Sequence, residues 1–176
     1  VVDVKLAAVV GAGTMGGGIA MCFADSGIPV KLLEISQEFL DAGMAKIKAN
    51  YETSIKRGSL TADGMAERLA LIDPVIEYEA IADADMVIEA VFEEMNVKKE
   101  VIAKLDSVVA PDALVATNTS YLDVNELAAA SVHPDRVLGM HFFSPANVMK
   151  LLEVVRASAT SNTALATVMP LAKIGR

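Results

Sequence analysis

A glycine-rich turn between an apolar strand and a helix is the feature that most constrains this chain. Gly11, Gly13 and Gly16 follow the apolar run 5–10 and open the helix-like stretch 14–25. In such a turn, the first glycine permits a tight change of direction and the second lets the backbone approach a pyrophosphate. The third lets the helix pack closely against the strand. The turn predicts a dinucleotide-binding strand–helix–strand unit, although a purely structural turn could contain the same glycines.

An acidic residue at the end of the second predicted strand strengthens this interpretation. Glu34 ends the run Val30–Glu34, 18 residues after Gly16. A carboxylate there can accept hydrogen bonds from both hydroxyls of an adenosine ribose, and it would repel a 2′-phosphate. Gly17 and Gly18 agree with a bound cofactor, because a glycine costs a helix interior roughly 0.5–1 kcal/mol unless close packing requires it. We therefore expect NAD, rather than NADP, as the cofactor.

Short β-branched runs alternate with longer helical patterns along the chain, which is typical of a mainly parallel sheet with crossover helices. The expected strands are 5–10, 30–34, 72–76, 86–91, 114–117, 137–141 and 151–155. The expected helices are 14–25, 37–57, 61–69, 97–109, 124–130 and 161–176, with Thr61 and either Ser161 or Asn162 as caps. Pro170 should kink or end the last helix. The fold class is α/β: one Rossmann-type domain, 1–176, with a doubly wound, mainly parallel sheet and helices on both faces.

The composition excludes several classes of partner. A net charge of −8 argues against nucleic acid or an anionic membrane, and no apolar stretch approaches the ~20 residues that span a bilayer. The single cysteine, Cys22, rules out an internal disulfide and suits a reducing compartment. We expect a protein of the cytoplasm, or of the peroxisomal or mitochondrial matrix in a eukaryote, without a metal site.

Two ionisable residues stand in apolar runs near the C-terminus. His141 ends the run 137–140, and Glu153 lies within 151–155. A carboxylate in such a run is expected to be partly buried, and burial without a partner is costly. Glu153 could accept from one imidazole nitrogen of His141, which would leave the other nitrogen as a general base. A structural ion pair, or two residues that never meet, is equally consistent with the spacing.

Other polar residues follow the ends of central strands. Glu93 and Glu94 come after the strand 86–91, and Asn118–Ser120 comes after the strand 114–117. Ligands of open α/β sheets bind at the carboxyl edge, where these residues should lie. A helix cap or a simple turn is the alternative interpretation.

Four segments, in this order, resemble the NAD-binding domain of the 3-hydroxyacyl-CoA dehydrogenases of fatty-acid β-oxidation. They read GAGTMGGGIA, VIEAVFEEMNVKKEV, TNTSYL and HFFSPANVMKLLEVV, and the similarity runs from about Lys5 to the C-terminus. The resemblance implies the NAD-dependent oxidation of an (S)-3-hydroxyacyl-CoA to the 3-oxoacyl-CoA, with an acyl-CoA as the substrate.

The resemblance also implies roles for individual residues. His141 matches the catalytic base that takes the 3-hydroxyl proton as hydride leaves C3, Glu153 matches the carboxylate that orients it, and Ser120 matches a serine near the nicotinamide and the substrate oxygen. Asn50 and Arg57 fall where the family contacts coenzyme A, although a solvated helix face is the alternative. Cofactor contacts are implied for Gly11, Gly13, Thr14, Met15, Gly16, Glu34, Ala90, Val91, Glu93, Lys98, Asn118, Ser120 and Ser144.

The chain departs from the family's pattern in two respects. Ser144 stands where single-function enzymes usually have asparagine, and HFFSPA looks more like the bifunctional chains that carry an enoyl-CoA hydratase. The family's helical C-terminal domain, which supplies dimer contacts and closes over the acyl-CoA, is missing, and the helix 161–176 is expected to lead towards it. We expect the cofactor-binding half of a longer, dimeric enzyme, inactive or weakly active alone.

Two alternatives to this expectation stay open. One is an NAD(H)-binding module without activity of its own. The other is a dehydrogenase of a 3-hydroxy acid that lacks coenzyme A, but such enzymes often use a lysine base, and HFFSPANVMKLLEVV is not their pattern.

Overall fold

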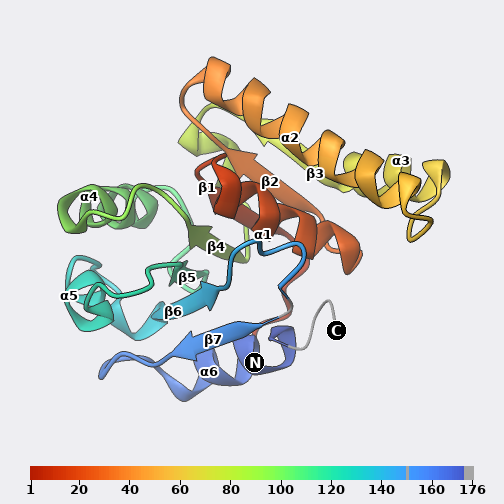
Figure 1. Ribbon diagram of the computed structural model, residues 1–176. Helices are drawn as coiled ribbons and strands as arrows, with labels where there is room; N and C mark the ends of the chain where they lie inside the picture. The colour runs from red at the N-terminus through yellow and green to blue at the C-terminus, as the bar shows by residue number, and fades with distance from the viewer. Residues whose placement is uncertain (150, 173–176) are drawn as a thin grey trace.

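A sheet with strand order β3-β2-β1-β4-β5-β6-β7 runs through the molecule and carries α-helices on both faces (Figure 1). The computed structural model describes residues 1–149 and 151–172. The strands are β1 (Ala7–Val10), β2 (Val30–Leu33), β3 (Ile72–Val75), β4 (Met86–Glu89), β5 (Leu114–Thr117), β6 (Val137–Phe142) and β7 (Leu152–Val155). The helices are α1 (Thr14–Asp25), α2 (Gln37–Lys56), α3 (Ala62–Leu71), α4 (Met95–Asp106), α5 (Val124–Ala129) and α6 (Asn162–Leu171).

Strands β1 to β6 are parallel, and β7 alone pairs in the antiparallel direction, with β6. The strands β1, β4 and β5 are buried at every residue, as expected for parallel strands covered on both faces. The strand order changes direction between β1 and β4, and ligands of such sheets bind in the crevice at that point. The predicted fold class is confirmed.

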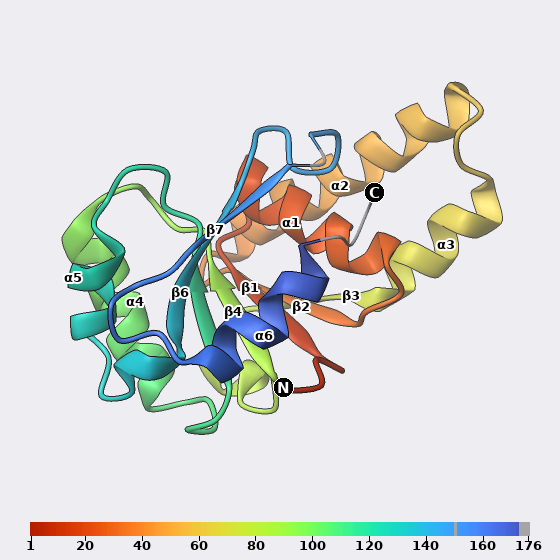
Figure 2. The same cartoon turned by 90° about the horizontal axis from the view of Figure 1, so that it is seen from below.

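Alternate residues of each strand serve two cores, because successive side chains point to opposite faces. Ala7 and Val9 of β1 pack in the core that also holds residues of α1, α2 and α6. Ala8 and Val10 pack in the other core, with residues of α4 and α5. Seen from below, α4 and α5 lie on one side of the strands, and α1, α2 and α3 lie on the other (Figure 2).

Most of the described α-helices begin at a side chain that accepts a backbone N–H. The predicted cap Thr61 accepts from Gly64, and Ser161, rather than Asn162, accepts from Ala164. Ser36, Glu94 and Asp123 cap α2, α4 and α5. Helix α1 is the exception among them, because its N-cap residue is Gly13 and no side chain satisfies its first N–H groups.

The predicted boundaries differ from the observed ones where local capping decides. Helix α4 begins at Met95, two residues before its predicted start, because the Glu94 carboxylate caps it. Two short 3-10 helices, η1 (Tyr78–Ile81) and η2 (Pro134–Arg136), were not predicted. Pro170 lies inside α6, which ends one residue later, and residues 173–176 of the predicted helix lie outside the described residues.

No helix in the described part of the chain is long and apolar enough to cross a membrane.

Candidate functional site

The glycine turn has a backbone geometry that side chains at two of its positions would prevent. Gly11 has φ of 104°, and a Cβ built there would lie 2.8 Å from the carbonyl oxygen of Ala90. A Cβ at Gly16 would overlap the carbonyl oxygen of Gly11. The turn therefore lies tightly between the ends of β1 and β4, while α1 passes directly over it.

The third glycine of the turn, Gly13, fits a different role. A Cβ built on Gly13 would meet no atom within 4 Å, so open space lies over the uncapped N-terminus of α1. The next residue, Thr14, is exposed, and its hydroxyl accepts a hydrogen bond of 2.7 Å from the ammonium of Lys46 on α2. Free N–H groups, the positive end of a helix and a nearby cation fit the pyrophosphate of NAD.

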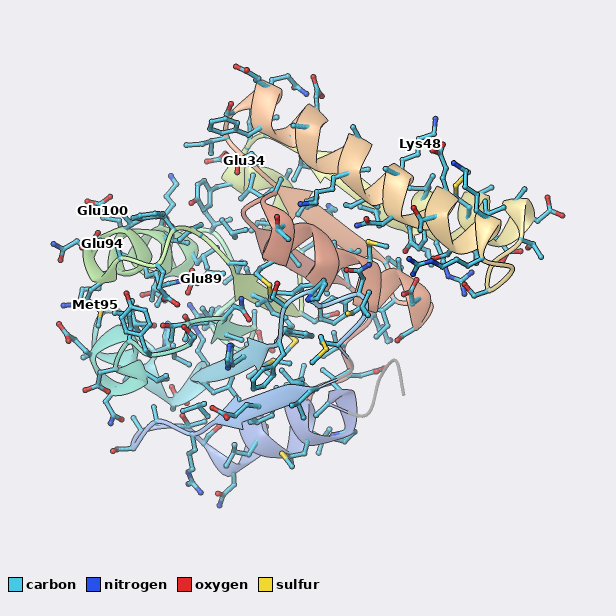
Figure 3. The ribbon with its side chains drawn as sticks, in the orientation of Figure 1. Glu34, Lys48, Glu89, Glu94, Met95 and Glu100 are labelled. Carbon is cyan, nitrogen blue, oxygen red and sulfur yellow. The ribbon has the colours of Figure 1, made fainter. Side chains whose placement is uncertain are left out.

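Glu34 follows β2 and lies beside this turn (Figure 3). One carboxylate oxygen accepts from the N–H of Ala12 at 3.3 Å, and the other accepts from the N–H of Ser36 at 3.3 Å. The side chain is only half-buried. Backbone contacts thus hold the carboxylate beside the glycine turn, where it can accept hydrogen bonds from a ribose.

A buried ion pair lies beneath the next loop, and the sequence analysis did not predict it. Glu89, the last residue of β4, is 0% exposed, and Lys98, on the first turn of α4, is 2% exposed. The Lys98 ammonium donates to both Glu89 oxygens at 2.9 Å, and the hydroxyl of Thr117 also donates to Glu89. Burial raises the pKa of Glu89 above its ordinary value, against the opposing effect of the Lys98 ammonium.

Glu93 joins this loop to the one that follows β5. Its carboxylate accepts from the hydroxyl of Thr119 at 2.6 Å, and from the N–H and hydroxyl of Ser120 at 3.0 and 3.1 Å. Partial burial alone would raise the pKa of Glu93, but these hydrogen bonds and the Lys98 ammonium outweigh it and lower the pKa. Glu93 therefore stays ionised and holds the exposed Ser120 in one orientation.

Asn118 joins the same loop to β6. Its side-chain oxygen accepts a hydrogen bond of 2.9 Å from the N–H of Phe142, the residue that follows His141. Ser144 is exposed and precedes a cis peptide bond to Pro145.

His141 and Glu153 are direct partners in the antiparallel register of β6 and β7. Directly opposed residues of antiparallel strands point to the same face of a sheet, so the two side chains share a face. In the described part of the chain no hydrogen bond or ion pair links them, and the His141 ring packs against Phe143 at 4.6 Å between centroids. Glu153 is exposed. The expectation of partial burial was wrong because β7 is the last strand of the sheet and leaves this residue open to solvent.

Of the two residues predicted to contact coenzyme A, Asn50 lies on α2 and Arg57 directly follows it. Asn50 is half-buried and its amide lies 3.8 Å from the sulfur of Met21, while the exposed Arg57 follows the end of the helix. A cavity of about 320 Å³ opens beside this helix. Its lining includes Asp25, Tyr51, Arg68, Met140 and Phe142.

Within the described residues, no group of three or more His, Cys, Asp or Glu side chains is placed to hold a metal ion.

Comparison with known proteins adds the family. A sequence model of the 3-hydroxyacyl-CoA dehydrogenase, NAD binding domain, matches residues 6–176. The fatty acid oxidation complex subunit alpha of Pseudomonas putida is 42% identical over 171 residues, which cover 97% of this chain and 24% of that protein. The peroxisomal fatty acid beta-oxidation multifunctional protein of Arabidopsis thaliana is 36% identical over 170 residues, covering 97% of this chain and 23% of that protein. The chain spans about a quarter of the length of the curated relatives it matches.

Solved structures agree with these relatives. The 3-hydroxybutyryl-CoA dehydrogenase of Escherichia coli K12 matches with a TM-score of 0.94 and 42% identity, over 97% of this chain and 36% of that chain. The (S)-3-hydroxybutyryl-CoA dehydrogenase of Ralstonia eutropha matches with a TM-score of 0.96 and 35% identity, over 99% of this chain and 62% of that chain.

Proposed function

The chain belongs to the family of 3-hydroxyacyl-CoA dehydrogenase NAD-binding domains, and we propose that it is the cofactor-binding half of an enzyme that oxidises (S)-3-hydroxyacyl-CoA to 3-oxoacyl-CoA. The observation that carries the proposal is the convergence on one sheet edge of the glycine turn, Glu34, Ser120 and His141. Each of these lies near or directly after the carboxyl end of a different parallel strand, and ligands bind at this edge.

Different segments of the chain bind different parts of the cofactor. The uncapped N-terminus of α1 at Gly13, Thr14 and Met15 binds the pyrophosphate, and Glu34 binds the adenosine ribose. The loops after β4, β5 and β6, with the first turn of α4, hold the nicotinamide half. Their contacts come from Ala90, Val91, Glu93, Lys98, Asn118, Ser120 and Ser144, as the resemblance implies.

A bound nicotinamide supplies the hydride acceptor, and a residue of this chain must accept the proton of the 3-hydroxyl group. His141 takes the 3-hydroxyl proton as the C3–H hydride departs, and Glu153, its partner across the strands, orients the imidazole and offsets the new charge. Ser120 lies near the nicotinamide and the substrate oxygen, as the resemblance implies. Because Glu153 is exposed and bonds no other described residue, it is free to turn towards His141 when substrate binds.

The acyl-CoA substrate extends along α2, where Asn50 and Arg57 contact the coenzyme. We further propose that the whole enzyme is dimeric, with 161–176 leading into a helical domain that closes the site. We place it in the cytoplasm, or in the peroxisomal or mitochondrial matrix.

Titration of the 176-residue chain with NADH, followed by calorimetry and by NADH fluorescence, tests cofactor binding. We expect saturable binding with little turnover of acetoacetyl-CoA, because hydride transfer requires the substrate to be held and water to be excluded. No binding of NADH would contradict the proposed function.

In the full-length enzyme, His141→Gln should lower kcat with acetoacetyl-CoA and NADH by about 10² to 10⁴ while NADH affinity is kept. His133→Gln, a half-buried histidine before η2, is the matched control. Equal activity of the His141 variant would overturn the assigned base.

A further inference from the structure

Gly18, in the middle of α1, lies against the loop that joins β6 to β7. A Cβ built on Gly18 would lie 3.1 Å from the Cβ of Ala146, and 3.4 Å from the backbone nitrogens of Ala146 and Asn147. The first distance is shorter than nearly all contacts that real side chains make. In Figure 1 this loop, drawn in blue, passes across α1. A glycine inside a helix is less stable than an alanine, so the close approach of the loop is what accounts for Gly18.

The same face of α1 contacts the loop a second time. Cys22, four residues after Gly18, donates from its thiol to the carbonyl of Ala146 at 3.2 Å. Residues four apart are neighbours on a helix surface, and Ala146 is only 3% exposed between the elements that cover it. Gly18 and Cys22 together therefore fix the position of Ala146 relative to α1.

The loop that contains Ala146 begins beside the proposed base. The ring of Phe143, three residues before Ala146, packs against the ring of His141 at 4.6 Å between centroids. The N–H of Phe143 also donates to the carbonyl of Leu151 at 3.3 Å, which closes the loop at its start. A displacement of Ala146 away from α1 would therefore move Phe143 and change the surroundings of His141.

Helix α1 also holds the cofactor, because its uncapped N-terminus at Gly13 is the proposed pyrophosphate site. The hydride and the proton leave one carbon–oxygen group of the substrate, so their two acceptors must be held in line with it. We propose that Gly18 is a positioning residue, which sets the distance between the cofactor held by α1 and the base His141 on β6. This inference rests on the proposed function.

The variant Gly18→Ala adds one methyl group to this contact in the full-length enzyme. The matched control is Gly17→Ala, whose Cβ would make an ordinary contact of 3.5 Å with Ile47. The double variant Gly18→Ala/Ala146→Gly removes the opposing methyl group, and Ala146→Gly alone completes the cycle. Thermal unfolding, the KM for NADH and kcat with acetoacetyl-CoA are compared for all four variants and the wild type.

We expect Gly18→Ala to fold and to keep its KM for NADH while kcat falls roughly tenfold, because small misplacements of reacting groups lower the rate steeply. The double variant should regain most of the lost kcat, and Gly17→Ala should match the wild type. Wild-type kcat in the folded Gly18→Ala variant would overturn the inference. An equal loss in Gly17→Ala, or a loss that Ala146→Gly does not restore, would also overturn it.

A second variant covers failure of Gly18→Ala to fold. Ala146→Val enlarges the same contact from the loop and leaves α1 unchanged, so it should show the same selective loss of kcat. If both variants unfold, the contact is a stability element and the inference is wrong. A wild type that does not consume NADH with acetoacetyl-CoA contradicts the proposed function itself, whereas failure of this inference is seen only in the variants, so the two failures are distinguishable.

Discussion

Glu34 is the side chain that we propose distinguishes NAD from NADP. Its carboxylate is held by the N–H groups of Ala12 and Ser36, so it cannot easily move away from a 2′-phosphate. Glu34→Gln keeps the shape and removes the repulsion, and we expect the preference for NADH over NADPH to fall by about tenfold. Fluorescence titration with both cofactors measures this. Glu38→Gln, an exposed change on the first turn of α2, should leave the preference intact.

The residues that could be predicted are those whose role follows from their place in the chain. Glu34 directly follows β2 at a set distance from the glycine turn, so its place beside that turn could be expected from the sequence, and its role at the adenosine ribose stays a prediction. Glu89 also stands in an apolar run, but its partner Lys98 lies on the following helix. Only the packing of α4 against β4 brings the two charges together, and sequence spacing alone does not determine that packing.

Lys46 escaped prediction for a similar reason. It lies 32 positions from Thr14, and only the crossing of α2 over α1 brings the two together. Nothing in the sequence around a lysine on an exposed helix face indicates such a contact.

At the scale of elements, two glycines of the turn are expected to serve different purposes: Gly16 allows the fold to pack, and Gly13 leaves space for the cofactor. Gly16→Ala should unfold the chain or destabilise it by several kcal/mol, because its Cβ would overlap the Gly11 carbonyl. The Cβ added by Gly13→Ala would meet no atom within 4 Å, so this variant should lose less than about 1 kcal/mol of unfolding free energy. It should nevertheless weaken NADH binding by tenfold or more, because the methyl group occupies the space above α1.

Urea unfolding and NADH titration of both variants provide the measurement. If Gly13→Ala bound NADH at full strength, the pyrophosphate would not lie where we propose.

Helix starts were predicted best where a local side chain caps them, as at Thr61 and Ser161. The start of α4 was missed because Glu94 was read as an edge residue, although it caps the helix. The short η1 and η2 could not be predicted, because three or four residues carry no periodic pattern.

At the scale of the whole molecule, a second buried ion pair ties α4 to the start of β6. Arg136 is 3% exposed, and its guanidinium donates to Asp106 at 2.6 Å and to the Ala110 carbonyl at 2.7 Å. Burial alone would raise the pKa of Asp106, but hydrogen bonds from Val132, Ser131 and Arg136 outweigh it and lower the pKa.

A lowered pKa in the folded state fixes the sign of the pH dependence. The contribution of Asp106 is complete above its unfolded pKa of about 3.9 and is lost as the pH falls through the lower folded value. Asp106→Asn should remove that part of the acid sensitivity. It should also lower the free energy of unfolding by about 3 kcal/mol at neutral pH, because the buried Arg136 loses the charge of its partner. Urea unfolding between pH 3 and 7 tests this, with the exposed Asp112→Asn as the control. An unchanged acid profile would contradict this role.

The order of the strands was beyond prediction, although their parallel character was not. Continuous apolar runs such as Ala7–Val10 and 86–88 indicate strands covered on both faces. Their pairing with each other, and of His141 with Glu153, depends on contacts between residues far apart in sequence. Sequence alone therefore left open whether His141 and Glu153 would lie opposite each other.

The sheet order has a consequence for affinity. Glu34 follows β2 and the Ser120 loop follows β5, so three strand spacings of about 4.8 Å, about 14 Å in all, separate the proposed contacts of the adenosine and nicotinamide halves. A ligand held at both must lie extended across the edge, with each half bound by a different part of the sheet. Joining the halves makes the second contact intramolecular, so the whole dinucleotide should bind far more tightly than either mononucleotide alone.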